Sequence, residues 1–191
     1  MPGVTPTTGN GLTAALLLAR GRSAGVVLLS NDLPTALFSF RAALICLPIF
    51  ALLRLLVWSL REEPAAGTLV VLLAEAIGYV LSWTAFALIS RLLAEQAGRL
   101  EAWPRFIAAW NWVNVVHYLL LSALVVPMAL GFPPFLGVLI GLLALGYALW
   151  LEYFVVRSAL EAGRGTPVMF VSVNLFLGLL IGGMVARVSG G

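Results

Sequence analysis

The sequence predicts an all-α fold, a polytopic membrane helix bundle with five transmembrane helices, the N-terminus inside and the C-terminus outside. Of the 191 residues, 62% are hydrophobic and only 10% are charged, whereas a soluble domain is about half apolar and about a quarter charged. The apolar residues lie in five long runs. Each run is long enough to cross about 30 Å of hydrocarbon as a helix.

The five predicted spans together form one transmembrane domain, residues 34–188. They cover 36–60, 67–93, 106–130, 136–156 and 168–188. Charged, proline-containing segments separate the first three spans, at 61–64 and 95–105. A turn at 131–134 and a segment with two glycines at 157–167 separate the remaining spans. Proline, glycine and charge at these points are typical of helix ends.

Residues 1–33 are predicted to form a cytosolic N-terminal arm. The apolar stretch 12–29 is interrupted by Arg20, Gly21 and Arg22, so neither half can span a membrane. We expect 12–18 to form a short amphipathic helix at the interface, with the arginines towards lipid phosphates. A re-entrant segment or a loose cytosolic arm is the alternative. Residues 1–11 carry no positive charge, which argues against a cleaved signal peptide.

The first membrane helix is predicted to begin near Asp32, because a capping residue is followed by Pro34. The arginines then set the orientation, since cytoplasmic loops are enriched in basic residues. All basic residues are arginine, which suggests GC-rich coding and a bacterial inner membrane protein. With the N-terminus inside, the predicted outside segments hold only Arg61 and Arg187, and Arg54 lies within a span. The inside segments hold Arg20, Arg22, Arg41, Arg91, Arg99, Arg105, Arg157 and Arg164.

Several polar residues fall inside the predicted spans. Arg54 and Glu75 lie at similar depths on neighbouring antiparallel helices, so we predict an ion pair between them, either a gate or proton relay or a neutralising structural pair. Asn111, Asn114 and His117 are spaced by three and spread over one broad helix face. They form either an interhelical hydrogen-bond ladder or a proton path.

Another acidic residue and two glycine pairs complete the candidate positions. Glu152 is expected to reach the cytosolic interface near Arg157. Glycines four residues apart let membrane helices approach closely. Such pairs occur at Gly137 and Gly141 and again at Gly178 and Gly182, with Asn174 one turn before the second pair on the same face. The sequence leaves open whether these glycines pack within the chain or across a dimer.

We expect no enzyme activity, no cofactor and no metal site. Phosphate-binding, dinucleotide-binding, nucleophile-elbow and zinc-protease motifs are absent. The single histidine and the single cysteine, Cys46, do not make a metal-ligand set. The arginines are dispersed rather than clustered, so nucleic-acid binding is not expected either.

The segment 33–41, Leu-Pro-Thr-Ala-Leu-Phe-Ser-Phe-Arg, and the Leu47-Pro48 pair after it resemble the start of the first helix in bacterial members of the Yip-domain (Ypt/Rab-interacting-type) family. The resemblance covers about residues 33–188 and implies five spans, a cytosolic N-terminus and a non-catalytic bundle. The Asp-Leu-Tyr-Gly-Pro-type signature of eukaryotic members is absent, so no functional residue is carried over.

The sequence therefore predicts a Yip-like scaffold or accessory subunit. Its expected partners are the lipid bilayer and another membrane protein or a second copy of the chain. The alternative is a small transporter or permease component, in which Arg54, Glu75, Asn111, Asn114 and His117 line one path. A path predicts that these five face one water-accessible cavity, whereas a scaffold predicts that they are paired and buried.

Overall fold

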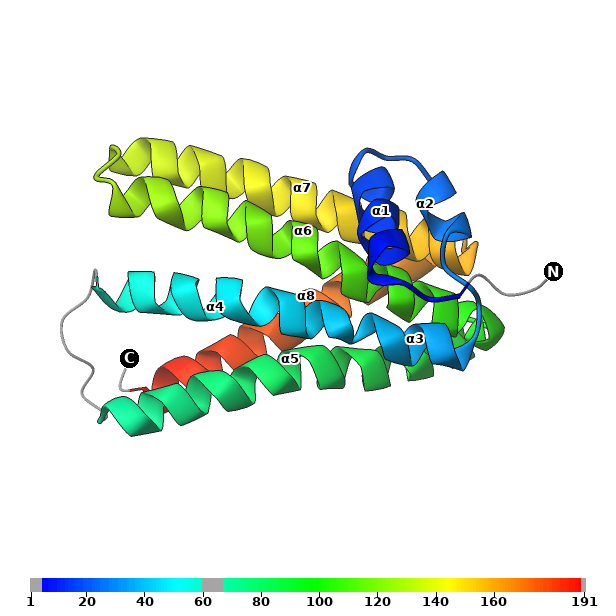
Figure 1. Ribbon diagram of the computed structural model, residues 1–191, viewed down its shortest axis with the longest axis horizontal. Helices are drawn as coiled ribbons and strands as arrows, with labels where there is room; N and C mark the ends of the chain where they lie inside the picture. The colour runs from blue at the N-terminus through cyan, green and yellow to red at the C-terminus, as the bar shows by residue number, and fades with distance from the viewer. Residues whose placement is uncertain (1–4, 60–66, 190–191) are drawn as a thin grey trace.

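The computed structural model describes residues 5–59 and 67–189 (Figure 1). In this part of the chain all regular structure is helical. The short helices are α1 (Thr8–Ala19), α2 (Ala24–Val27), α3 (Leu33–Ser39) and a 3-10 turn, η1 (Leu100–Ala102). The long helices are α4 (Arg41–Ser59), α5 (Thr68–Gln96), α6 (Trp103–Ala129), α7 (Pro134–Leu160) and α8 (Gly165–Val188).

Five segments are long and apolar enough to span a membrane, which confirms the predicted all-α bundle with five transmembrane helices. The orientation of the termini stays a prediction. The first of the five segments joins α3 and α4 across Phe40. The predicted separator at 61–64, with Arg61, lies outside the described residues. Helices α5, α6 and α7 extend several residues beyond their predicted spans at one end of the bundle, where charged residues replace apolar ones.

Local sequence explains where the helices start. The Thr7 side chain accepts a hydrogen bond from the Asn10 N–H (3.1 Å) at the start of α1. The Asp32 carboxylate accepts one from the Thr35 N–H (2.7 Å) at the start of α3, as predicted. Such side-chain oxygens satisfy N–H groups that have no partner within the helix. Proline in the first turn of α7 supports its start, because its fixed φ already suits a helix.

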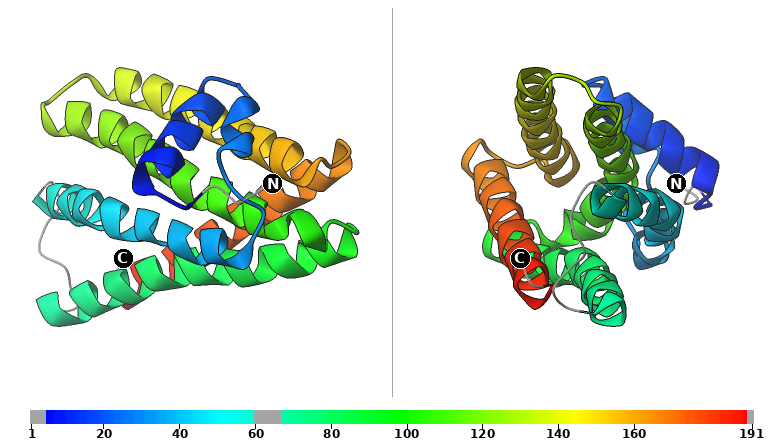
Figure 2. Two further views of the ribbon diagram at one scale, coloured as in Figure 1. Left: turned by 45° about the vertical axis from the view of Figure 1, so that its right-hand side comes forward. Right: turned by 90° about the vertical axis from the view of Figure 1, so that its left-hand side faces the viewer.

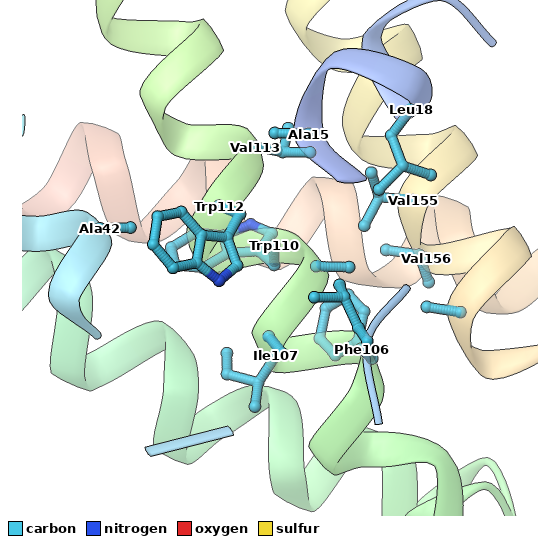
Figure 3. Close-up of a cluster of buried hydrophobic side chains, with 14 of the residues drawn as sticks. Ala15, Leu18, Ala42, Phe106, Ile107, Trp110, Trp112, Val113, Val155 and Val156 are labelled. Atoms are coloured by element: carbon cyan, nitrogen blue, oxygen red, sulfur yellow. The ribbon is translucent and has the colours of Figure 1, made fainter. Parts of the chain in front are cut away.

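Helix α6 is the centre of the bundle. It packs against α1, α3, α4 and α7, while α8 closes the other side by packing against α5 and α7 (Figure 2). The main core lies where α1 crosses α6, with Phe106, Ile107 and Trp112 of α6 almost fully buried among residues of α1, α4 and α7 (Figure 3). We call this end of the bundle, where α1–α3 pack, the arm end. The opposite end, with the 131–133 turn and the end of α8, is the far end.

The N-terminal arm is docked onto the bundle rather than loose. A Cβ atom at Gly11 of α1 would lie 2.1 Å from Cε2 of Trp112, so only glycine allows this approach. The Tyr147 hydroxyl of α7 donates a hydrogen bond to the Ala19 carbonyl. The Asn31 amide donates to the Glu101 carbonyl (2.9 Å) and accepts from the Arg105 N–H (3.2 Å). These contacts join the arm to both α6 and α7.

Candidate functional site: the intramembrane polar residues

Arg54 of α4 and Glu75 of α5 form the predicted ion pair. The Arg54 Nη2 and Nε atoms lie 2.6 and 2.7 Å from the same carboxylate oxygen, Oε2. The Arg54 side chain is 38% exposed and that of Glu75 only 12%. An unpaired charge inside a membrane is costly, so each residue neutralises the other. The prediction of contact is confirmed.

Side chains, rather than close backbone packing, connect α4 with α5. The two helices are not among the closely packed pairs of the bundle. They are linked instead by the Arg54–Glu75 pair, by the Tyr79 hydroxyl donating to the Ala43 carbonyl (2.6 Å) and by the rings of Phe50 and Tyr79, whose centroids lie 4.7 Å apart. Long polar and aromatic side chains therefore fill the space between these two helices.

The three polar residues of α6 do not form one continuous ladder. The Asn111 amide donates to Ser39 Oγ of α3 (2.8 Å), and Ser39 in turn donates to the Ala36 carbonyl. Asn114 donates instead to the Trp110 carbonyl of its own helix. His117 Nδ1 lies 3.4 Å from Asn114 Oδ1, while the imidazole borders Ala148 of α7. Asn111 thus forms its hydrogen bond with α3, whereas His117 lies on the side of α6 that faces α7.

The expectation that Glu152 reaches the interface is wrong. The residue is 5% exposed and its carboxyl group lies next to the side chains of Trp110 and Asn174. The reason is helix phase, because position 152 of α7 falls on the side that packs against α6 and α8. Asn174, one turn before Gly178 on α8, lies next to the Glu152 carboxyl group. At the arm end, Arg105 of α6 forms an ion pair with Glu161, the residue after α7 (2.9 Å).

Several buried polar atoms remain without a hydrogen-bond partner among the described residues. Four of them lie on the facing helices α6 and α7 within the bundle: Asn111 Oδ1, His117 Nε2, Trp110 Nε1 and Glu152 Oε1. No hydrogen bond or ion pair joins His117 to Glu75. The five residues proposed for a path are therefore divided among three separate contacts.

An apolar groove lies elsewhere, between α5 and α8. It has a volume of about 290 Å³ and is lined only by apolar residues of α5 and α8. None of the five residues proposed for a path lines it. The lining residues are Val70, Leu73, Ala74, Ile77, Gly78, Leu81, Ile181, Met184, Val185 and Val188.

The glycines of α8 face away from the rest of the chain. No heavy atom lies within 4 Å of a Cβ added at Gly178 or Gly182, and both residues are exposed. Gly137 is buried and Gly141 is half-buried. The closest helix contact in this region was missed by sequence reasoning: a Cβ at Gly78 of α5 would lie 2.6 Å from Val185 Cγ2 of α8. Ala74, Gly78 and Ser82 are spaced by four, so a search for small residues in general, rather than for glycine pairs, would have marked this face of α5.

Comparison of the chain with protein-family models, curated proteins and solved structures gives no match. The five apolar helices identify an integral membrane protein with several spans.

Proposed function

We propose that this protein is a non-catalytic membrane scaffold or accessory subunit that associates through α8 with a second copy or another membrane protein. The observation that carries this proposal is that the polar residues make contacts within the chain, whereas the spaced glycines of α8 make none with the rest of the described chain. The Arg54–Glu75 ion pair and the Asn111–Ser39 hydrogen bond connect helices within the chain. Gly178 and Gly182, in contrast, are exposed, and a Cβ at either would have no heavy atom within 4 Å.

The chemistry of membrane association supports this assignment. Membrane helices lack a hydrophobic drive to associate, so they depend on close van der Waals contact between small residues. Gly178, Gly182 and Ala186 follow at intervals of four along α8 and are all exposed. A partner helix could approach along this line more closely than along the leucines beside it.

The five-span count favours the Yip-like form of this role, and the lysine-free composition favours a bacterial inner membrane. Both belong to the proposal and rest on features of the sequence. In this form the protein organises or stabilises other membrane proteins and carries no reaction of its own.

The test is a pull-down of the tagged full-length protein in gentle detergent, followed by mass spectrometry of everything retained. We expect a stoichiometric partner or a defined homo-oligomer. The double variant Gly178→Leu/Gly182→Leu should reduce the assembled fraction at least about tenfold, because two branched side chains block close approach. Gly146→Leu on α7 is the matched control, since this glycine is also exposed with no atom within 4 Å. Equal loss in both would contradict the proposal.

Transport is the second candidate, and one observation favours it. Three buried polar atoms on α6 and α7, Asn111 Oδ1, His117 Nε2 and Glu152 Oε1, lack partners among the described residues. Water or a solute could satisfy them in another state of the bundle. The test is to measure flux across proteoliposomes that contain the protein. A pH-dependent flux that is lost in His117→Ala and in Glu75→Gln would show that the protein is a transporter and would contradict the scaffold proposal.

A further inference from the structure

We propose that the turn Arg20–Arg22, together with Arg157 of α7, forms a binding site for the phosphate headgroup of an anionic phospholipid. The site lies at the arm end, where the turn after α1 lies beside α7 (Figure 1). The nearest side chain of α7 to Gly21 is Trp150. It is independent of the association surface on α8.

The turn holds its two arginines in a fixed arrangement. Gly21 has a φ of +71°, a region that favours glycine. Its N–H donates to the Leu18 carbonyl (2.9 Å), and the N–H of Arg22 donates to the Leu17 carbonyl (2.9 Å). These two bonds form a Schellman motif that ends α1. Arg20 and Arg22 therefore flank the glycine on a defined backbone rather than on a loose loop.

Aromatic side chains of α7 lie directly beneath this turn. A Cβ at Gly21 would lie 3.4 Å from Cη2 of Trp150. The Trp150 ring packs against Tyr147 on one side and stacks on Phe154 on the other, with centroids 5.5 and 5.6 Å away. Tryptophan and tyrosine gather at the level of the lipid headgroups. This aromatic row places the turn at headgroup depth.

The arginines at this point are free to bind an anion. Arg20, Arg22 and Arg157 are exposed, and no ion pair or side-chain hydrogen bond joins them to any described residue. Arg157 follows Phe154 by three residues, so it continues the same face of α7. Guanidinium groups bind phosphate through paired N–H donors. The occupant we infer is a lipid phosphate, because the row beneath the turn is aromatic and Trp150 is 44% exposed, so acyl chains can pack beside a headgroup held by the arginines.

A second turn of the same type provides the control. Gly98 (φ +65°) lies in the turn that follows α5, and the N–H of Arg99 donates to the Ala94 carbonyl (2.8 Å) in the same motif. Arg99 thus occupies the position that Arg22 has after α1. No atom lies within 4 Å of a Cβ at Gly98, so this turn has no aromatic row beneath it. The control variant is Arg91→Gln/Arg99→Gln, which removes two exposed arginines elsewhere at the arm end.

The experiment is a titration of the full-length protein in mild detergent with phosphatidylglycerol or phosphatidylcholine, followed by native mass spectrometry. We expect preferential binding of phosphatidylglycerol. Arg20→Gln/Arg22→Gln should weaken it roughly 30-fold, about fivefold for each arginine, while Arg91→Gln/Arg99→Gln leaves it within about twofold. Equal loss in the two double variants would overturn the site, because it would show a general effect of net charge.

Two further variants and a competitor test the site itself. Arg20→Lys/Arg22→Lys retains the charge and should recover most of the binding, which excludes a folding defect as the cause of loss. Trp150→Leu should weaken phosphatidylglycerol binding by a smaller factor. An unchanged affinity would show that the aromatic row of α7 is not part of the site. Glycerol 3-phosphate in millimolar excess should not displace the lipid. Full displacement would identify a site for a soluble phosphate and overturn the lipid assignment.

Discussion

The arm end and the far end of the bundle are built differently. At the arm end, residues 106–113 of α6 are buried without interruption, and α1, α3, α4 and α7 surround them. Towards the far end, no described residue of α6 beyond Val115 is buried, and Gly137 is the only buried one among those described in the first half of α7. The ribbons of α4 and the α6–α7 pair also draw apart in this direction (Figure 2).

The type of contact changes along with the packing. Aromatic rings at the arm end interlock, as in the edge-on contact between Phe106 and Phe170 at 5.2 Å. Towards the far end, α4 and α5 are joined by the Arg54–Glu75 ion pair. Because most of the buried side chains lie at the arm end, we infer that packing there contributes most of the stability of the fold. The helix surface at the far end remains exposed, as the proposed association within the membrane requires.

The largest effect should come from removing a ring at the arm end. Phe106 is fully buried and contacts Phe86 and Phe170, so Phe106→Ala should lower the free energy of unfolding by about 3 kcal/mol. Phe135 at the far end is 68% exposed, and Phe135→Ala should change it by less than about 0.5 kcal/mol. Unfolding by SDS in mixed micelles measures both. Similar losses would mean that the two ends are equally packed in the membrane.

The next effect concerns the tie between α4 and α5. Glu75→Leu leaves Arg54 without its partner and should cost about 2 kcal/mol, less than for a fully buried pair because Arg54 is 38% exposed. Arg54→Leu/Glu75→Leu should recover most of that loss, since neither charge then remains in the membrane. A double-mutant cycle in the same unfolding assay gives the coupling energy. Additive losses would show that the two side chains do not stabilise each other.

The sequence predicted the features that depend on composition and helix length. The number of spans follows from apolar runs that must cross a fixed thickness of hydrocarbon. The Arg54–Glu75 contact follows from depth, because two antiparallel neighbours bring residues at equal depth together. The start of α3 at Asp32 and Pro34 follows from local capping chemistry.

The sequence could not predict the features that depend on how the helices are rotated about their axes. In an almost uniformly apolar span, polarity does not mark the inward face, so the surface position predicted for Glu152 is wrong and the residue is buried. Small residues spaced by four also occur on several helices, so the spacing alone does not show which face makes a close contact within the chain. Gly11 and Gly78 allow the closest approaches to Trp112 and Val185, while the spaced pair Gly178 and Gly182 contacts nothing within the described chain.

A smaller effect is expected where α1 meets α6. Gly11→Ala places a methyl group within 2.1 Å of the buried Trp112 ring, so the arm must shift, at a cost of about 1–2 kcal/mol. Gly146→Ala is the matched change on α7 with open space around it, and it should be neutral or stabilise by up to about 1 kcal/mol. Protection of the 8–19 amides in hydrogen exchange reports the arm directly. If Gly11→Ala leaves this protection unchanged, α1 does not depend on the contact with Trp112.

The smallest effect separates an interhelical hydrogen bond from a local one. Ser39 is fully buried and accepts the Asn111 amide, so Ser39→Ala leaves that amide unpaired and should cost about 1 kcal/mol. Ser122 is half-buried towards the far end and donates only to the Tyr118 carbonyl of its own helix, so Ser122→Ala should change the free energy of unfolding by less than about 0.3 kcal/mol. Ser39→Ala/Asn111→Leu, which removes both polar groups, should be closer to wild type than Ser39→Ala alone. If the double variant is the less stable of the two, Asn111 stabilises the fold through a group other than Ser39. Its Oδ1 atom, which has no hydrogen-bond partner among the described residues, is then the group to test.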